Sequence, residues 1–268
     1  MKWAWGLPLL ICLVCPALAN IDRLYYPRPE ANFDERTGYP LALLRLAFER
    51  HPDLSNIHLT PTDVKMPRGR ALMLLEQGVA VDIFWAIASQ ERLQKLQPVK
   101  FPLYKGMFGY RLLLIRKTDI DEFALISGAD LLRKKVAGLA YDWPDFRILK
   151  NNNFVVQGST TYAGLFQLLA KKRVDYLPRS LFEIDAEQQY FASQGLVIEP
   201  NLALQYPVNF YYFVNKGRVG LADKIHESLL DLQNEGKTDL LFEAIYADLV
   251  NQSNLSDRTI FHLKTFSP

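Results

Sequence analysis

Strand-like and helix-like segments alternate along nearly the whole chain, and this order constrains the fold more than any other feature. Apolar, strand-like runs occur at 79–87, 110–115 and 210–214, and segments such as 69–77 and 161–172 have the leucine spacing of amphipathic helices. The run at 79–87 is almost continuously apolar, which is typical of a strand covered on both faces. Because such a chain buries its sheets under helices, we predict an α/β fold.

The first 19 residues have the pattern of a secretory leader. Lys2 supplies a positive start, residues 3–19 carry no charge, and Ala17-Leu18-Ala19 is a small-x-small sequence of the kind that a signal peptidase cuts. We therefore predict a signal peptide at 1–19, a mature chain that starts at Asn20, and export from the cytoplasm. A membrane anchor is the alternative, although about 17 apolar residues is at the lower limit for spanning a bilayer.

Cysteine content and charge narrow the class of protein. Cys12 and Cys15 both lie in the leader, so the 249 residues that remain when 19 are removed from 268 contain no cysteine and no disulfide. Such a chain depends on its hydrophobic core, and its length allows a large one. Loss of Lys2 lowers the net charge from +2 to +1, which argues against nucleic-acid binding. The four histidines lack metal-ligand spacing, so we expect no metal and no cofactor.

Three stretches of the mature chain together point to one family. The first is Gly69-Arg70-Ala71 through Gly78 with Val81-Asp82, and the second is Pro102 through Gly106 with Gly109-Tyr110-Arg111-Leu112. The third runs from Gln157-Gly158-Ser159-Thr160-Thr161 through a helix to Arg173-Val174-Asp175-Tyr176. In this order they resemble bacterial periplasmic solute-binding proteins of family 3, the polar-amino-acid type of ABC transporter substrate-binding protein. The resemblance covers nearly all of residues 20–250.

This resemblance implies a two-lobed type II periplasmic binding protein fold with mixed, mostly parallel sheets and two hinge crossings. Lobe one would comprise 20–115 and 210–268, and lobe two would be the inserted segment 116–209. The crossings would be Leu112–Lys117 and Tyr206–Phe210. Closure about such a hinge buries a ligand between the lobes.

The resemblance also suggests which residues hold a carboxylate. Ser159, Thr160 and Thr161 precede a helix, whose free N–H groups and dipole favour an anion. Arg92 is at the position of an arginine that binds the ligand carboxylate through two parallel hydrogen bonds. Plain N-capping and an exposed helix arginine are the respective alternatives.

Further candidates follow strands at the expected cleft. Tyr26 and Trp85 end strands of lobe one, where α/β proteins bind ligands, although both could instead pack in the core. Arg28 and Glu30 follow the first strand, and Asp142 and Trp143 lie on a strand-to-helix loop. For all four, surface exposure is the alternative.

Arg179 is the main departure from the family pattern. Amino-acid binders have an aspartate near this position, and it receives the ligand's α-ammonium group. A guanidinium repels an ammonium, so we expect Arg179 to bind an acidic or polar group of the ligand instead. Glu183 could substitute for it, but Ser180-x-x-Glu183 reads as a capping box.

We therefore predict binding of a small polar, acid-bearing solute by a periplasmic monomer that serves an ABC transporter permease or a membrane receptor. One alternative is a cleft enzyme of the dehydratase type, which would need a carboxylic acid such as Asp142 or Glu183 for proton transfer. The other is a periplasmic protein that binds another protein.

Overall fold

The structure is a computed structural model that describes residues 22–30, 34 and 36–265. The predicted signal peptide at 1–19 lies outside the described residues and stays a prediction. None of the described helices is both long enough and apolar enough to cross a membrane.

The first group of elements is built around strand β10, and we call it the β10 half. In it β1 and β2 pair in parallel, while β10 lies between β3 and β4 and is antiparallel to both. Its members are β1 (Arg23–Arg28), α1 (Gly38–Arg50), β2 (His58–Lys65), α2 (Arg68–Gln77), β3 (Ile83–Ile87), α3 (Gln90–Lys95), β4 (Leu96–Val99), β10 (Phe210–Asn215) and α9 (Val219–Asn234).

The second group is built around strand β9, and we call it the β9 half. One sheet has the order β11-β9-β5-β8, and a second consists of the parallel pair β6-β7. Its strands are β5 (Tyr110–Arg116), β6 (Val136–Ala140), β7 (Val155–Ser159), β8 (Leu177–Ser180), β9 (Leu196–Gln205) and β11 (Thr259–His262). Its helices are α4 (Ile120–Ala124), α5 (Ala129–Arg133), α6 (Pro144–Asn151), α7 (Tyr162–Ala170) and α8 (Ile184–Tyr190). Short 3₁₀ turns occupy Met107–Gly109, Lys117–Asp119, Ala192–Gln194 and Leu255–Asp257.

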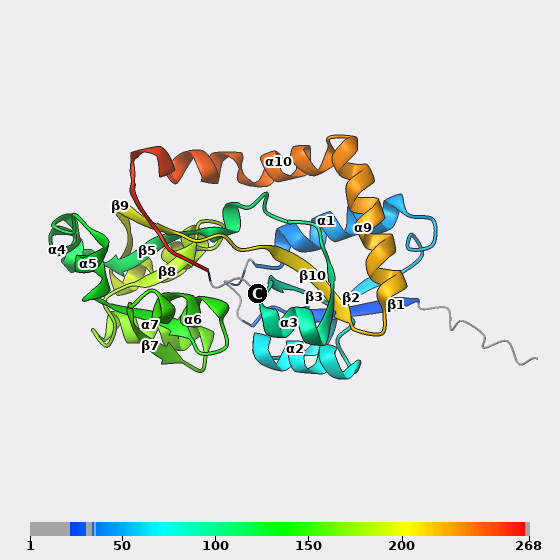
Figure 1. The fold of residues 1–268 in the computed structure, drawn as a ribbon, viewed down its shortest axis with the longest axis horizontal. Helices are drawn as coiled ribbons and strands as arrows, with labels where there is room; N and C mark the ends of the chain where they lie inside the picture. Colours follow the sequence, from blue (N-terminus) through cyan, green and yellow to red (C-terminus); the bar gives the residue numbers. More distant parts are fainter. Residues whose placement is uncertain (1–21, 31–33, 35, 266–268) are drawn as a thin grey trace, which may run out of the picture.

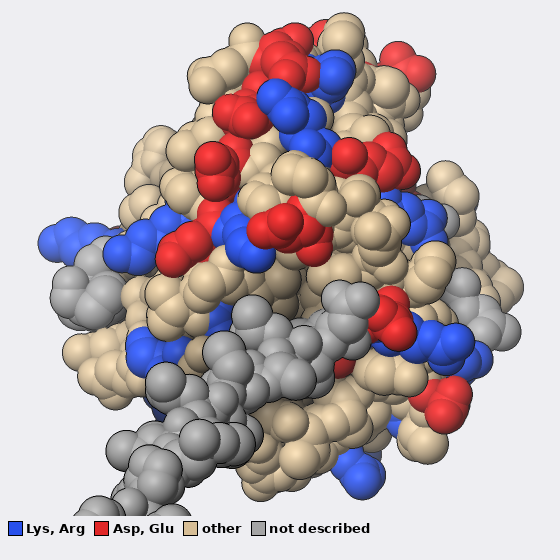
Figure 2. Space-filling view, turned by 90° about the vertical axis from the view of Figure 1, so that its right-hand side faces the viewer, with Lys and Arg blue, Asp and Glu red and all other residues tan. Residues whose placement is uncertain are grey.

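Helix α10 (Lys237–Gln252) links the two groups. It runs along one side of the molecule from the end of α9 to the β9 half, where the chain continues into β11 (Figure 1). On the face shown in Figure 2, basic and acidic side chains are interspersed. Several of the exposed charges form ion pairs, such as Lys224 with Asp53 and Arg50 with Glu235.

Several element boundaries follow from local chemistry. Gly78 ends α2 in the left-handed conformation with φ of 71°, and Ser89 caps α3 by accepting a hydrogen bond from the backbone N–H of Arg92. Pro144 starts α6 at a position where its missing N–H costs nothing. The expected strand at 79–87 is shorter than predicted and begins at Ile83, because Ala80, with φ of 58°, turns the chain after α2.

The structure corrects two sequence predictions. Three of the seven strand pairings in the described chain are parallel, so the expectation of mostly parallel sheets is wrong: β5 and β10 run antiparallel to their neighbours. The capping box of Ser180 and Glu183 is wrong as well. Ser180 is the last residue of β8, α8 begins only at Ile184, and the carboxylate of Glu183 accepts a hydrogen bond from Arg179 instead.

Aromatic side chains pack where the two halves meet. Phe108 and Phe210 have ring centroids 4.2 Å apart, and Phe182 lies 4.7 Å from both Tyr104 and Tyr246. All five are buried, and they join the cores of the two halves into one hydrophobic cluster. Phe108 and Phe210 also line a pocket between the two halves.

Candidate ligand-binding site

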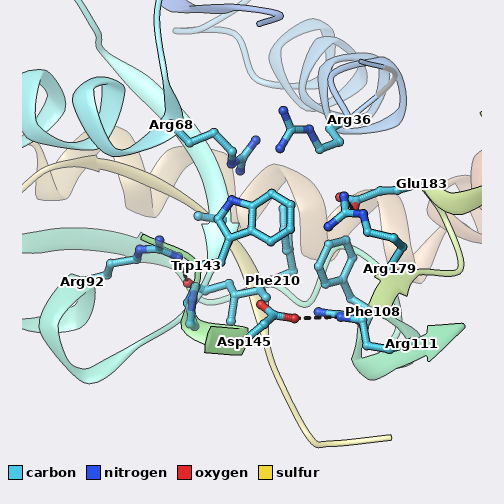
Figure 3. Close-up of a pocket in the computed structure, with 13 residues that line it drawn as sticks. Arg36, Arg68, Arg92, Phe108, Arg111, Trp143, Asp145, Arg179, Glu183 and Phe210 are labelled. Carbon is cyan, nitrogen blue, oxygen red and sulfur yellow. Dashed lines mark hydrogen bonds and ion pairs between the residues drawn. The ribbon is translucent and has the colours of Figure 1, made fainter. Parts of the chain in front are cut away.

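A pocket lies between the β10 half and the β9 half, and five arginines line it (Figure 3). Arg36, Arg68 and Arg92 come from the β10 half, and Arg111 and Arg179 from the β9 half. The space between the lining side chains is about 420 Å³, part of it open to solvent.

Trp143 and two carboxylates complete the polar lining. The indole lies in the middle of the pocket in Figure 3, with the guanidinium of Arg179 over its ring at 4.4 Å from the centroid. The lining carboxylates are Asp145 and Glu183.

The charge of Arg179 is neutralised by two carboxylates. Its Nη2 lies 2.7 Å from Oε1 of Glu187 and 2.6 Å from Oε2 of Glu183, and the hydroxyl of Tyr162 also donates to Glu187. Burial lowers the pKa of Arg179, but attraction by Glu187 and Glu183 outweighs it and the pKa is raised. Burial also raises the pKa of Glu187, and Arg179 offsets part of that effect.

Arg111 and Asp145 form a second buried pair. The distance from Nε of Arg111 to Oδ1 of Asp145 is 2.8 Å, and the hydroxyl of Tyr206 donates to the same oxygen. Burial alone would raise the pKa of Asp145, but Arg111 and Tyr206 lower it below its ordinary value. Asp145 is therefore ionised at neutral pH and compensates Arg111.

Arg36 is compensated as well. Its Nε and Nη2 lie 2.6 and 2.7 Å from the two carboxylate oxygens of Asp34, a bidentate arrangement. Its guanidinium also reaches across to the β9 half, where it lies over the ring of Tyr162 at 4.1 Å. This cation–π contact is one of those that join the two halves beside the pocket.

Arg68 and Arg92 differ from the other three arginines. Within the described residues neither guanidinium forms an ion pair with a carboxylate, and both donate only to backbone carbonyls. Nη2 of Arg68 lies 2.5 Å from the oxygen of Trp85, and Nη1 of Arg92 lies 2.7 Å from that of Ile87. Burial, together with repulsion by Arg36, lowers the pKa of Arg68 to about 10, and burial also lowers the pKa of Arg92.

Among the residues predicted from sequence, Arg92 and Arg179 line this pocket, as do Trp143 and Glu183. Tyr26 and Trp85 lie in the core with ring centroids 5.8 Å apart, which is the packing alternative considered for them. Arg28, Glu30 and Trp85 line a second, smaller pocket beside Arg68. Nε of Arg28 donates there to the carbonyl of Thr62 at 2.8 Å.

Ser159, Thr160 and Thr161 are not among the residues that line either pocket. Thr161 caps α7, since its hydroxyl accepts from the backbone N–H of Gly164 at 3.2 Å, and Ser159 donates to the carbonyl of Thr161. Ligand contact by these three residues stays a prediction.

Asp142 is exposed but lies at the junction of the halves. Its backbone carbonyl accepts from Nη2 of Arg92 at 3.4 Å. Its carboxylate packs so closely on Gly69 that a Cβ added there would be 2.9 Å from Oδ2. The loop after β6 therefore touches the start of α2.

Sequence reasoning missed Arg36, Arg68, Arg111 and Asp145. Arg111 carried a usable signal, because a charged residue inside the apolar run 110–115 requires a buried partner. Arg68 carried a weaker one, directly after Pro67 at the first position of a helix. No feature of the sequence indicated that Arg36 lines the pocket.

No protein-family model and no curated protein sequence matches the chain. Solved structures do match it in fold. An ancestral arginine-binding protein bound to glutamine has a TM-score of 0.65 at 17% identity, covering 84% of this chain and 98% of its own. An amino acid ABC transporter substrate-binding protein from Streptococcus pneumoniae bound to L-arginine has a TM-score of 0.62 at 13% identity, with coverage of 84% and 94%.

A third similar structure is an ancestral amino-acid-binding protein described as a precursor of cyclohexadienyl dehydratase. Its TM-score is 0.61 at 16% identity, and the match covers 84% of this chain and 96% of that one. The chain therefore has the fold of the periplasmic amino-acid-binding proteins of ABC transporters, and the resemblance drawn from its sequence is confirmed at the level of the fold.

Proposed function

We propose that the chain is a periplasmic binding protein that encloses a small polar, acid-bearing solute between two lobes. The observation that carries this proposal is the pocket at the junction of the two halves, lined by arginines from both. A solute in it would touch both halves at once, so binding and closure would be coupled.

The lobes that we propose follow the strand pairings. Lobe one comprises residues 22–99 and 210–252, and lobe two comprises 110–205 and 259–265. The first crossing then precedes residue 110, earlier than the expected Leu112–Lys117, because every residue of β5 lies within the sheet of β8 and β9. The second, 206–209, agrees with the expected Tyr206–Phe210.

The C-terminal segment gives a third connection that the sequence expectation lacked. Strand β11 pairs with β9, so we assign it to lobe two rather than to lobe one with the rest of 210–268. Leu263 is 4% exposed within the core of the β9 half, and its backbone N–H donates to Gln205. Helix α10 would thus act as a strap that restrains hinge motion.

Charge supports an acid-bearing solute. Arg111, Arg179 and Arg36 each form an ion pair with a carboxylate, whereas Arg68 and Arg92 form none within the described residues, although Asp34 and Glu183 attract Arg68 and Asp142 and Asp145 attract Arg92. Two guanidiniums without an ion-paired carboxylate therefore line the pocket. Arg92 is the arginine that we propose binds a carboxylate, in agreement with its sequence position. The structures of similar fold are described as bound to glutamine and arginine, and a cationic solute such as arginine suits this pocket less well.

We propose that such a protein is exported through its signal peptide and works as a monomer in the periplasm. It would pass the solute to an ABC transporter permease or present it to a membrane receptor. The enzyme alternative needs a carboxylic acid that holds a proton, but of its two candidates Asp142 does not line the pocket and Glu183 is paired with Arg179. Asp145, the other lining carboxylate, has a lowered pKa and is unsuitable as well.

The proposal is tested by denaturing the purified, exported protein and identifying released small molecules by mass spectrometry. We expect one small organic acid at close to one equivalent. In parallel, thermal unfolding is measured with amino acids, organic acids and polyamines. If no acid is released and none raises the Tm, while a cation does, the proposed function is wrong.

A further inference from the structure

We propose that the solute is an organic dianion and that Arg68 and Arg92 bind its two negative charges. Two carboxylates, or one doubly ionised phosphate monoester, would meet this requirement. The inference rests on the proposed function, because it names the class of solute for the same pocket.

The first step is the charge balance of the pocket. Arg111 has Asp145 as its partner, Arg36 has Asp34, and Arg179 has two glutamates. These three arginines shape the pocket but need no further anion. Two guanidiniums are left, and each keeps N–H groups for which no hydrogen bond is made within the described residues.

The second step is where these two guanidiniums lie. Arg68 starts α2, its guanidinium packs on the ring of Phe84 at 4.4 Å, and it points toward Arg36 on the same side of the pocket (Figure 3). Arg92 comes from α3 and reaches toward the loop of Asp142. In the close-up the two side chains approach the indole of Trp143 from different directions, so acidic groups at two positions of one solute could reach them.

The third step is the cost of leaving one of them unpaired. In a closed pocket the effective dielectric constant is far below that of water, so a guanidinium without a counter-charge is disfavoured. The neighbouring Arg36 adds repulsion at Arg68, and Asp34 and Glu183 offset part of this effect without forming an ion pair with it. A solute with one negative charge brings only one counter-charge for two guanidiniums, and it should bind more weakly than a solute with two.

Isothermal titration calorimetry at pH 7.5 with matched probes tests this inference. The carboxylate pair is glutarate and glutaramate, which differ by one charge at nearly the same size, and the phosphate pair is glycerol 3-phosphate and its methyl diester, which has one negative charge fewer. We expect the dianion of at least one pair to bind at least about tenfold more tightly than its partner, since a hydrogen bond to a charged group typically contributes that much. The pair that shows the preference identifies the acidic group.

Variants then assign the preference to a residue. Arg68→Gln should lose most of the tenfold difference between the two members of the pair, and Arg68→Lys should keep part of it. Arg70→Gln, on the exposed side of the same helix, is the matched control and should leave the difference unchanged. The Tm of each variant shows whether it is folded.

The outcomes separate the inference from the proposed function. If monoanions bind as tightly as dianions, or if Arg68→Gln weakens both members of a pair equally, the dianion inference is wrong and the proposed function stands. If only a monoanionic acid is released from the purified protein, the inference is also wrong. If no acid binds or is released at all, the proposed function itself fails.

Discussion

The guanidinium of Arg179 is held by the carboxylate of Glu187, with Nε 2.8 Å from Oε2 and Nη2 2.7 Å from Oε1. Both residues are buried, and Glu183 adds a second carboxylate at 2.6 Å. Arg179 therefore fixes the wall of the pocket through its neighbours, and its positive charge is already balanced.

Replacing Arg179 should consequently destabilise the fold. In Arg179→Ala the carboxylate of Glu187 stays buried without its partner, and we expect the free energy of unfolding to fall by about 3–5 kcal/mol. Urea unfolding at pH 7.5 measures this, with Arg147→Ala on the exposed side of α6 as a control near zero. The double variant Arg179→Met, Glu187→Leu should lose less unfolding free energy than Arg179→Ala, because no buried carboxylate is left without a partner. An equal or larger loss would contradict the pairing.

Gly109 and Tyr206 lie side by side in the two proposed crossings. A Cβ added at Gly109 would be only 2.1 Å from the backbone oxygen of Tyr206, and backbone cannot move aside as a flexible side chain can. Gly109→Ala should therefore lower the free energy of unfolding by about 1–3 kcal/mol, as overpacking usually does. Gly220→Ala, where the added Cβ meets nothing within 4 Å, is the control and should cost nothing measurable. Equal Tm values for the two variants would refute the close approach.

Acid should weaken the contribution of Asp145. Its pKa is lowered in the folded chain by Arg111 and Tyr206 despite burial, whereas in the unfolded chain it is about 3.9. Between these values the unfolded chain binds more protons, so the stability due to Asp145 is present above about pH 4 and is lost as the pH falls through the folded pKa. Burial raises the pKa of Glu30 and Glu187, and their contributions have the opposite sign.

The variant Asp145→Asn isolates this effect. We expect its deficit in unfolding free energy relative to the unmodified chain to be largest at pH 7 and to shrink below pH 4. Denaturant unfolding at pH 7, 5, 4 and 3 measures the deficit, with the exposed Asp248→Asn as control. A deficit that does not change with pH would mean that the charge of Asp145 is not what stabilises the fold.

The strap formed by α10 and β11 should restrain the proposed lobes. Leu263 is buried in the core of the β9 half, and the carboxamide of Asn152 bonds both backbone groups of Lys264 at 2.8 and 3.0 Å. Leu263→Ala should lower the free energy of local unfolding of the C-terminal segment by about 2–5 kcal/mol. Hydrogen exchange across 259–263 should then be faster. The radius of gyration in solution should rise as the lobes separate. Leu240→Ala, on the exposed side of α10, should change neither quantity, and unchanged exchange in Leu263→Ala would contradict the strap.

Much of the fold could be predicted from sequence because it rests on local signals. The apolar run at 110–115 became β5, and the glycine at 78 ended α2 as expected. Strand β11 was missed because a four-residue strand at a sheet edge has no local signature and depends on β9, about 55 residues away. Sheet direction was mispredicted because pairing is a tertiary property.

The candidate site was only partly predictable for the same reason. Arg92 could be placed by family pattern, but whether an arginine is free or neutralised depends on partners that are distant in sequence. Arg111 meets Asp145 34 positions later, and the carboxylates that neutralise Arg179 lie on and just before a helix predicted to be capped in another way. Arg68 became a candidate for ligand binding only from the structure, because its guanidinium forms no ion pair with a carboxylate of the described residues.

We propose that a solute enters between the two halves, and a reversible cross-link between Gly69 and Asp142 can test this. A Cβ at residue 69 would lie 3.6 Å from Cβ of Asp142, within the range of a disulfide. The variant Gly69→Cys, Asp142→Cys, prepared without residues 1–19 and so without any other cysteine, can therefore be locked by oxidation and released by a thiol reductant.

Calorimetric titration of this variant with the acid identified by mass spectrometry, before and after reduction, is the decisive measurement. The account predicts no heat of binding for the oxidised, solute-free protein and full binding after reduction, because the locked halves bar entry to the pocket. Equal affinity and equal heat of binding in the oxidised and reduced forms would show that the solute binds elsewhere, and would contradict entry between the two halves.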